Sequence, residues 1–415
     1  MTLKISVVDA CFPLTNQKGQ GLAATWLKYK IVKTGLVLED EIRRCDIILV
    51  TCVAAQQFAY VKSVKKKFNG KFIFVGGAAS TSPAVFGSYC DAVVVGDGQL
   101  FIETLAKSGV EDALKLPNIW VDGESRSVKV DNKFPWDAPP IQAEDGAYRL
   151  WCGRGCKKKC YFCQTGWGYE YSENPNPFKL DIQINGLLEK GEKIAYLSND
   201  PMQHSFFKKL PPVGHGSFSI QYLKKNGVPP ARQVRLGIEG VSERLRESVN
   251  KPISYDDLVK STAWLNENKK SVRLFMIAGL PGELAYDWEE LKNSILSWKR
   301  ISKKGVLALS FTAWCPDPAS PLAPMPLRDD YYEYWLDFKK WFFEGLGFSN
   351  RIKLMQPQNP QSRLKKAMSS MCLSEEELRI GGKWGPNDRV EYPYKAKAKN
   401  IYLRLANAER AKQDT

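Results

Sequence analysis

Three cysteines that lie close together in the chain could hold a metal cluster. Cys156, Cys160 and Cys163 follow the spacing C-x3-C-x2-C, which allows three thiols to converge on one loop. Thiolates are the soft ligands that iron–sulfur clusters prefer, and a four-iron cube offers four irons to them. A structural zinc site normally takes four protein ligands, and Cys152 is the only other cysteine or histidine close by. The spacing therefore favours a [4Fe-4S] cluster with one open iron over a zinc knuckle or a disulfide pair.

This cysteine loop resembles the one that defines the radical SAM superfamily. In that family S-adenosylmethionine (SAM) chelates the open iron through its amino and carboxylate groups. An electron from the cluster then cleaves SAM into methionine and a 5′-deoxyadenosyl radical. The resemblance implies that Phe162, an aromatic residue directly before the last cysteine, packs against the adenine.

Further phrases match the same superfamily in the same order. Residues 236–246 resemble its "GIES" strand, and residues 277–283 resemble its "GLPGE" turn. Ser198 and Asn199 fall where the family binds the methionine amino group at the end of the second strand. The resemblance implies that Ser198, Asn199 and Glu239 contact SAM.

The elements that must position these residues are predicted from short apolar runs. The family's core is a partial (β/α)6 barrel, similar to a TIM barrel, and residues 148–328 have room for it. The strand before Cys156 and five later runs supply six strands with space for a helix between most neighbours. The five later runs span residues 193–200, 217–222, 233–240, 272–283 and 306–312.

Residues 1–110 predict a separate domain of the α/β class. β-Branched apolar runs are typical of buried parallel strands, and the intervening stretches 21–34 and 58–68 can form helices. The order predicts a Rossmann-like, doubly wound parallel sheet with its working edge at the carboxyl ends of the strands. The expected strands are residues 4–9, 46–51, 71–75 and 92–95.

The phrases at residues 75–81 and 91–105 resemble the N-terminal domain of cobalamin-type radical SAM enzymes. That family ligates cobalt through a histidine in a D-x-H-x-x-G loop after the first strand. The corresponding loop here contains no histidine, and the two histidines of the chain are His204 and His215. We therefore expect no cobalamin. The two histidines are candidates for acid–base chemistry or substrate contact.

A second comparison leaves an additional cluster open. Methylthiotransferases, which the domain also resembles, hold another cluster on three cysteines at strand ends. Cys11 and Cys52 occupy two such positions, whereas the third position is Ala78. Cys45 and Cys90 lie near other strand starts. The alternative is that these cysteines are buried as small apolar residues.

The remaining segments differ in composition. Residues 111–147 are punctuated by proline and glycine and predict a linker with a small hairpin. Residues 329–415 form a basic, aromatic C-terminal region, in which residues 331–343 predict an amphipathic helix. Lys and Arg outnumber Asp and Glu two to one over residues 351–415. Cations interleaved with aromatic rings suit phosphate and base contacts.

Composition sets the broad class. The 415 residues carry a net charge of +15 and ten cysteines. No run is long and apolar enough to cross a membrane, and the N-terminus does not read as a signal peptide. We expect a soluble, cytoplasmic protein of a bacterium or a phage-infected cell. The charge favours a nucleic acid partner, DNA before RNA, and the cluster calls for an electron donor such as a flavodoxin or ferredoxin.

The function that follows is a radical SAM enzyme, an isomerase or transferase, acting on nucleic acid. The sharpest expectation is isomerisation of a glycyl substituent on thymine during phage DNA hypermodification. The alternatives are a tRNA methylthiotransferase-like enzyme, a DNA photoproduct-lyase-like enzyme, and a small-molecule or peptide radical SAM enzyme. Cys315, at the end of the sixth expected strand, could return a hydrogen atom to a product radical.

Overall fold

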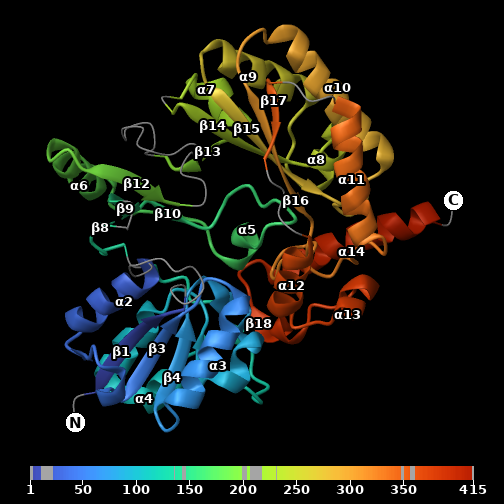
Figure 1. Cartoon of the computed structure of the whole chain (residues 1–415). Helices are drawn as coiled ribbons and strands as arrows, with labels where there is room; N and C mark the ends of the chain where they lie inside the picture. The colour runs from blue at the N-terminus through green and yellow to red at the C-terminus, as the bar shows by residue number, and fades with distance from the viewer. Residues whose placement is uncertain are drawn as a thin grey trace.

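The computed structural model shows two strand-rich parts and a helical C-terminal region that joins them (Figure 1). The N-terminal sheet lies at the bottom of the view, and the strands of the second part fan out above it. The predicted α/β class is confirmed, with parallel sheets in both parts. The structure describes residues 3–10, 22–134, 136–142, 146–198, 203–205, 217–229, 231–346, 350–355 and 360–413.

The N-terminal sheet has six strands in the order β2-β1-β3-β4-β5-β6. The first five strands in this order run parallel, and β6 pairs antiparallel with β5. The four predicted strands are confirmed; β2 and β6 were missed because two residues give no periodicity. The strands are β1 (Lys4–Asp9), β2 (Val37–Leu38), β3 (Ile47–Thr51), β4 (Phe72–Gly76), β5 (Ala92–Val94) and β6 (Ile119–Trp120).

Helices cover both faces of this sheet, as a doubly wound fold requires. α2 (Leu22–Lys33) and α4 (Gln99–Leu114) pack on one face, where Ile31 and Phe101 meet Phe74. α3 (Phe58–Lys67) packs on the other face through Val61 and Val64. All five residues of β3 are buried, because the strand is covered on both sides.

The second part contains two hydrogen-bonded sheets. β12 (Lys193–Leu197), β9 (Ala147–Trp151) and β8 (Ile141–Gln142) form one. Five parallel strands in sequence order form the other. All six predicted barrel strands are present, and within the described residues no ladder joins β12 to β13. The five strands are β13 (Ser217–Phe218), β14 (Gln233–Glu239), β15 (Ser271–Ala278), β16 (Leu307–Ala313) and β17 (Ile352–Leu354).

The prediction of a strand over residues 217–222 is wrong in its second half. β13 stops at Phe218, and Ser219 then caps a helix, because its hydroxyl accepts a hydrogen bond from the Tyr222 amide at 3.1 Å. A serine at this position satisfies an otherwise unpaired amide of the first turn. The helices of this part are α5 (Gln164–Gly168), α6 (Pro177–Glu189), α7 (Ile220–Asn226), α8 (Glu243–Ser248), α9 (Tyr255–Glu267) and α10 (Ala285–Ile301).

The C-terminal region begins with the predicted aromatic helix, α11 (Tyr331–Leu346), and a later segment of it, around Tyr392, lies beside the N-terminal part (Figure 1). Tyr392 is buried, and its hydroxyl donates to the Thr81 carbonyl at 2.6 Å. The later elements are α12 (Pro360–Met371), α13 (Glu375–Ile380), β18 (Val390–Glu391) and α14 (Lys395–Gln413).

The segment 111–147 is tied to its surroundings by three two-residue strands. β6 extends the N-terminal sheet, β7 (Val128–Lys129) pairs in parallel with β18, and β8 pairs with β9. No helix among the described residues is both long and apolar enough to span a bilayer.

A buried carboxyl group should make stability depend on pH. Glu283 is 2% exposed, and burial raises its pKa to about 7, although the Tyr334 hydroxyl and two main-chain amides oppose the shift. The folded state therefore holds a proton that the unfolded state has lost between about pH 4.5 and 7, so stability should fall across that window by about 3 kcal/mol. Urea unfolding at several pH values checks this.

The comparison is with two variants. Glu283→Gln cannot titrate at this position. The free energy of unfolding of the wild type, measured relative to that of Glu283→Gln, should therefore fall as the pH rises from 4.5 to 7.5. Glu376→Gln, which changes an exposed carboxylate, should run parallel to the wild type. If the difference in unfolding free energy between the wild type and Glu283→Gln stays constant with pH, Glu283 does not have the raised pKa.

Candidate iron–sulfur and SAM site

The cysteine loop is closed at its base by a short antiparallel ladder. β10 (Gly153–Arg154) pairs with β11 (Ser172–Glu173), so the loop leaves and re-enters at one place. Gly155 turns the chain into the loop with φ of +67°, and a Cβ there would lie 2.4 Å from the Glu170 carbonyl oxygen. Only glycine fits this position, because both the backbone angle and the space exclude a side chain.

Contacts from distant segments hold the loop in place. The Asn250 side chain donates to the Lys158 and Lys159 carbonyls at 3.0 and 2.9 Å. The Trp167 indole donates to the Cys160 carbonyl at 2.9 Å. The Lys159 ammonium lies 3.1 Å from the centre of the Tyr394 ring, a cation–π contact with the C-terminal region. The loop is thus positioned by the barrel and by the C-terminal region together.

All three cysteines of the motif line one cavity of about 600 Å³, with Phe162 and Glu239 on its walls. Among the described residues, no group of three Cys, His, Asp or Glu side chains is close enough to bind a single metal ion. A cubane makes a different demand, because each thiolate binds its own iron and the thiolates stand further apart. The donor set and the shared cavity fit a cluster bound by three thiolates.

The electrostatics of this cavity disfavour free thiolates. Burial raises the pKa of Cys160 to about 12, so the thiol stays neutral without a metal. The Lys251 ammonium partly opposes this shift, and it also pairs with Glu239 at 2.8 Å. Metal coordination deprotonates a thiol outright. Glu239 adopts φ of +65° at a bulge in β14, a strained conformation of the kind found at functional sites.

Ser198 reaches the cysteine loop through a hydrogen-bonded chain. Its hydroxyl lies 2.6 Å from His204 Nε2, and the Tyr171 hydroxyl lies 2.9 Å from His204 Nδ1. The neighbouring Gln203 donates to Cys156 Sγ at 3.1 Å and accepts from the Lys157 amide at 2.7 Å. This chain positions the first cysteine. Asn199 and His215 lie outside the described residues, as does Cys11.

Cys315 is placed away from the cysteine cavity. It is 6% exposed within the apolar core, with Sγ 3.1 Å from the Tyr331 hydroxyl. Burial raises the pKa of its thiol. Its role as a hydrogen donor therefore stays a prediction, and a substrate would need a path to the Cys315–Tyr331 pair.

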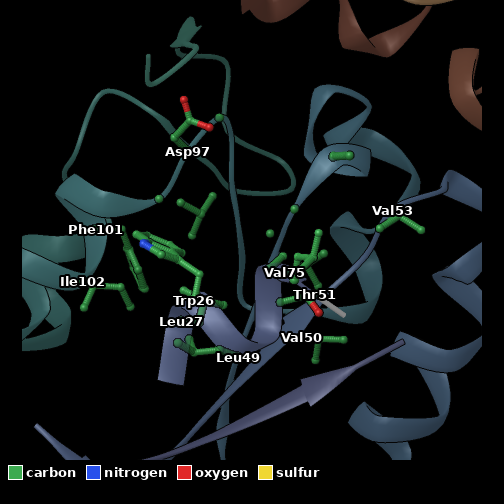
Figure 2. A pocket seen from close by; sticks show the side chains of 18 of the residues that line it. Trp26, Leu27, Leu49, Val50, Thr51, Val53, Val75, Asp97, Phe101 and Ile102 are labelled. Atoms are coloured by element: carbon green, nitrogen blue, oxygen red, sulfur yellow. The ribbon is translucent and has the colours of Figure 1, made fainter. Parts of the chain in front are cut away.

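A second cavity, of about 340 Å³, opens at the carboxyl edge of the N-terminal sheet (Figure 2). Apolar side chains from β3, α2 and α4 surround it, and Asp97 stands at one end. Buried Thr51 Oγ1, Trp26 Nε1 and Asp97 Oδ2 have no hydrogen-bond partner among the described residues. Asp97 pairs with Arg154 of the cysteine loop at 2.8 Å, and burial raises the pKa of Asp97 to about 6. The two cavities are thus linked through Arg154.

The residues around this second cavity do not fit histidine-ligated cobalamin. Both histidines of the chain lie beyond residue 200, so the N-terminal sheet offers cobalt no imidazole. Cys45 and Cys52 lie at opposite ends of β3, whose five residues span roughly 17 Å. Cys90 precedes β5 and is buried, with its pKa raised to about 12. One cluster cannot bridge the two ends of β3.

Sequence reasoning missed four residues that shape the site. Their positions gave little signal, because each acts across a long sequence separation. The sequence offered one signal, for Lys251. This basic residue follows the "GIEG" phrase by eleven residues, and that phrase was predicted to lie beside the thiolates. The four are Arg154, Lys159, Gln203 and Lys251.

Comparison with known proteins gives distant likenesses. No family model matches the chain. Uncharacterized protein MJ0966 of Methanocaldococcus jannaschii is 26% identical over 362 residues, which is 75% of each protein. The solved structure of OxsB, a cobalamin-dependent S-adenosylmethionine radical enzyme with aqua-cobalamin and S-adenosylmethionine bound, aligns with all of this chain at a TM-score of 0.43 and 16% identity.

The chain spans 62% of the length of that OxsB structure. SuiB of Streptococcus suis, solved with its precursor peptide SuiA, aligns at a TM-score of 0.32 and 12% identity over 63% of this chain and 62% of SuiB. None of these likenesses is close enough to assign the chain to a family. Our expectation that this chain works without cobalamin stays a prediction.

Proposed function

We propose that this chain is a radical SAM enzyme that modifies a nucleic acid. The observation that carries the proposal is the shared cavity, in which Cys156, Cys160 and Cys163 meet Phe162 and Glu239. Three thiolate ligands leave the fourth iron of a cubane open for a ligand that the protein does not supply. An aromatic ring and a carboxylate beside that position suit the adenine and amino groups of SAM.

A bound cluster would supply the electron that cleaves SAM into methionine and a 5′-deoxyadenosyl radical. The residues of the chain itself would bind the cluster and orient the groups around it. The three cysteines hold the cluster, and Gln203 and Asn250 fix the loop that carries them. Lys251 keeps Glu239 in place through their ion pair.

The charge of the chain supports a nucleic acid substrate. The net charge is +15, and exposed cations gather on helices that face solvent. On α3 they include Lys62, Lys66 and Lys67, and on α14 they include Lys397 and Arg404. Such cations neutralise phosphates and release counterions. They would equally favour an acidic electron donor of the flavodoxin or ferredoxin type.

Within this class we propose an isomerisation of a glycyl substituent on thymine in DNA. The chemistry needs one cluster and SAM, and within the described residues one cavity is lined by three cysteines. Sulfur insertion needs a second cluster, and the described cysteines of the N-terminal sheet are divided between its two ends. Photoproduct reversal would need Cys315 to reach the substrate radical.

Formation of 5′-deoxyadenosine tests the enzymatic class. Anaerobically reconstituted protein, given SAM and dithionite, should release 5′-deoxyadenosine, detected by mass spectrometry. The expected iron content is about four per chain. Protein that binds iron and sulfide but releases no 5′-deoxyadenosine would overturn the proposal.

Salt dependence tests the nucleic acid substrate. Binding of a single-stranded DNA oligonucleotide should weaken by about 300-fold or more between 50 and 200 mM salt if six or more phosphates are contacted. An RNA oligonucleotide of the same sequence serves as the comparison. An affinity that does not change with salt would favour a small-molecule or peptide substrate.

A further inference from the structure

A third cavity, of about 440 Å³, lies against the inner side of the five-stranded sheet and adjoins the cysteine cavity. Cys163, Phe162 and Glu239 line both cavities. A molecule in the third cavity would therefore touch the walls of the cysteine cavity. This position is where a substrate must lie to meet a radical formed there.

The inner face of the sheet carries positive charge where barrels normally carry branched apolar residues. Along β14, buried residues alternate with exposed ones, and Arg235 belongs to the exposed series. Arg235 pairs in register with Arg273 of β15. Two like charges side by side on one sheet face are destabilising, so this pair is unfavourable unless an anion lies near it.

A third arginine comes from the C-terminal region. Arg363 of α12 lines the same cavity as Arg235 and donates weakly to the Ala313 carbonyl at 3.4 Å. Arg235 approaches the Gln233 amide oxygen at 3.5 Å, and Arg273 donates to the Ser310 hydroxyl at 2.8 Å. In the described part of the chain, none of these guanidinium groups forms an ion pair with a carboxylate.

The two carboxylates in this cavity are too few to neutralise the basic side chains around it. Glu239 is held by Lys251 at 2.8 Å. Asp317 is the other carboxylate, and both Arg363 and Lys366 lie within electrostatic reach of it. The cavity therefore has an excess of fixed positive charge next to the predicted radical.

We propose that Arg235 and Arg363, with Arg273 beside them, bind an oxyanion of the substrate and thereby fix its reacting end next to the cysteine cavity. Planar guanidinium groups recognise carboxylate and phosphate oxygens in pairs. The inference rests on the proposed function, since it assigns the substrate of the same site. On the proposed substrate the oxyanion is either the glycyl carboxylate or a nucleotide phosphate.

Binding measured without reductant tests this site. The reconstituted protein with SAM is titrated calorimetrically with two probes. One is 2′-deoxyuridine bearing an N-linked glycine on a 5-methylene group, which has the carboxylate and no phosphate. The other is thymidine 5′-phosphate, which has the phosphate and no carboxylate. At least one should bind once per chain, and the one that does identifies the source of the oxyanion.

Variants on one helix provide the control. Arg363→Gln should weaken the affinity for the probe that the wild type binds by about tenfold or more. Lys365→Gln removes an exposed charge from the same helix and should leave the affinity within about twofold. Equal affinities in the two variants, or no binding of either probe to the wild type, would overturn the oxyanion site. Probe binding without 5′-deoxyadenosine formation would instead overturn the enzymatic proposal and leave this site standing.

Discussion

Replacing Cys160 with alanine should abolish 5′-deoxyadenosine formation and reduce bound iron from about four per chain to a background level. Cys160 is the central thiol of the three, and its side chain is 9% exposed at the base of the cysteine cavity. Two remaining thiolates would leave two irons of a cubane open. Iron and sulfide analysis, the visible spectrum and product mass spectrometry report the outcome.

Cys152→Ala is the matched control. Cys152 is buried four residues before the motif, in a small apolar cluster with Leu150 and Ile194. The variant should retain iron and activity. Loss of iron in both variants would mean that Cys152 is a fourth cluster ligand, which would leave no iron open for SAM. In cells that carry the modification, Cys160→Ala should also remove the modified nucleoside from DNA.

Gly155→Ala should prevent cluster assembly although it changes no ligand. The substitution has two costs. The backbone angle of +67° is disfavoured for alanine by about 1–2 kcal/mol, and the new Cβ would meet the Glu170 carbonyl oxygen at 2.4 Å. The chain must move at the entrance of the loop, which displaces Cys156 from its partners. The expected result is folded protein with little bound iron.

Gly146→Ala separates the two costs. Gly146 has φ of +75°, and a Cβ there would have no neighbour within 4 Å in the described part of the chain. This variant should therefore show the backbone cost alone, about 1 kcal/mol in urea unfolding, with normal iron content. If Gly155→Ala binds as much iron as Gly146→Ala does, the loop can accommodate a Cβ beside the Glu170 carbonyl oxygen, and the prediction is wrong.

Much of this molecule could be predicted from local patterns. Apolar β-branched runs located the four main strands of the N-terminal sheet and all six expected strands of the second part. The cysteine spacing predicted that three thiols would share a cavity, and the structure places Phe162 and Glu239 beside them. These features depend on residues near each other in sequence or on a strongly periodic pattern.

Other features depend on contacts that no local pattern encodes. Ser219 ended a predicted strand because a hydroxyl cap competed with β propensity. The paired arginines of β14 and β15 became visible only once the register was known. Cys315 lies at the predicted strand end, yet its side chain meets Tyr331 rather than the cavity. Side-chain direction depends on tertiary packing, which spacing alone does not give.

The parallel pair of β7 and β18 also has a consequence for synthesis of the protein. Tyr392 closes over Thr81 from 311 residues further along the chain. Ribosomes add about 5–20 residues per second, so the N-terminal sheet must wait many seconds with that face uncovered. Apolar residues that the C-terminal region later covers, Trp120 of β6 and Val128 of β7 among them, are open to solvent meanwhile. The nascent chain should therefore depend on a holding chaperone, and its yield should rise at lower growth temperature.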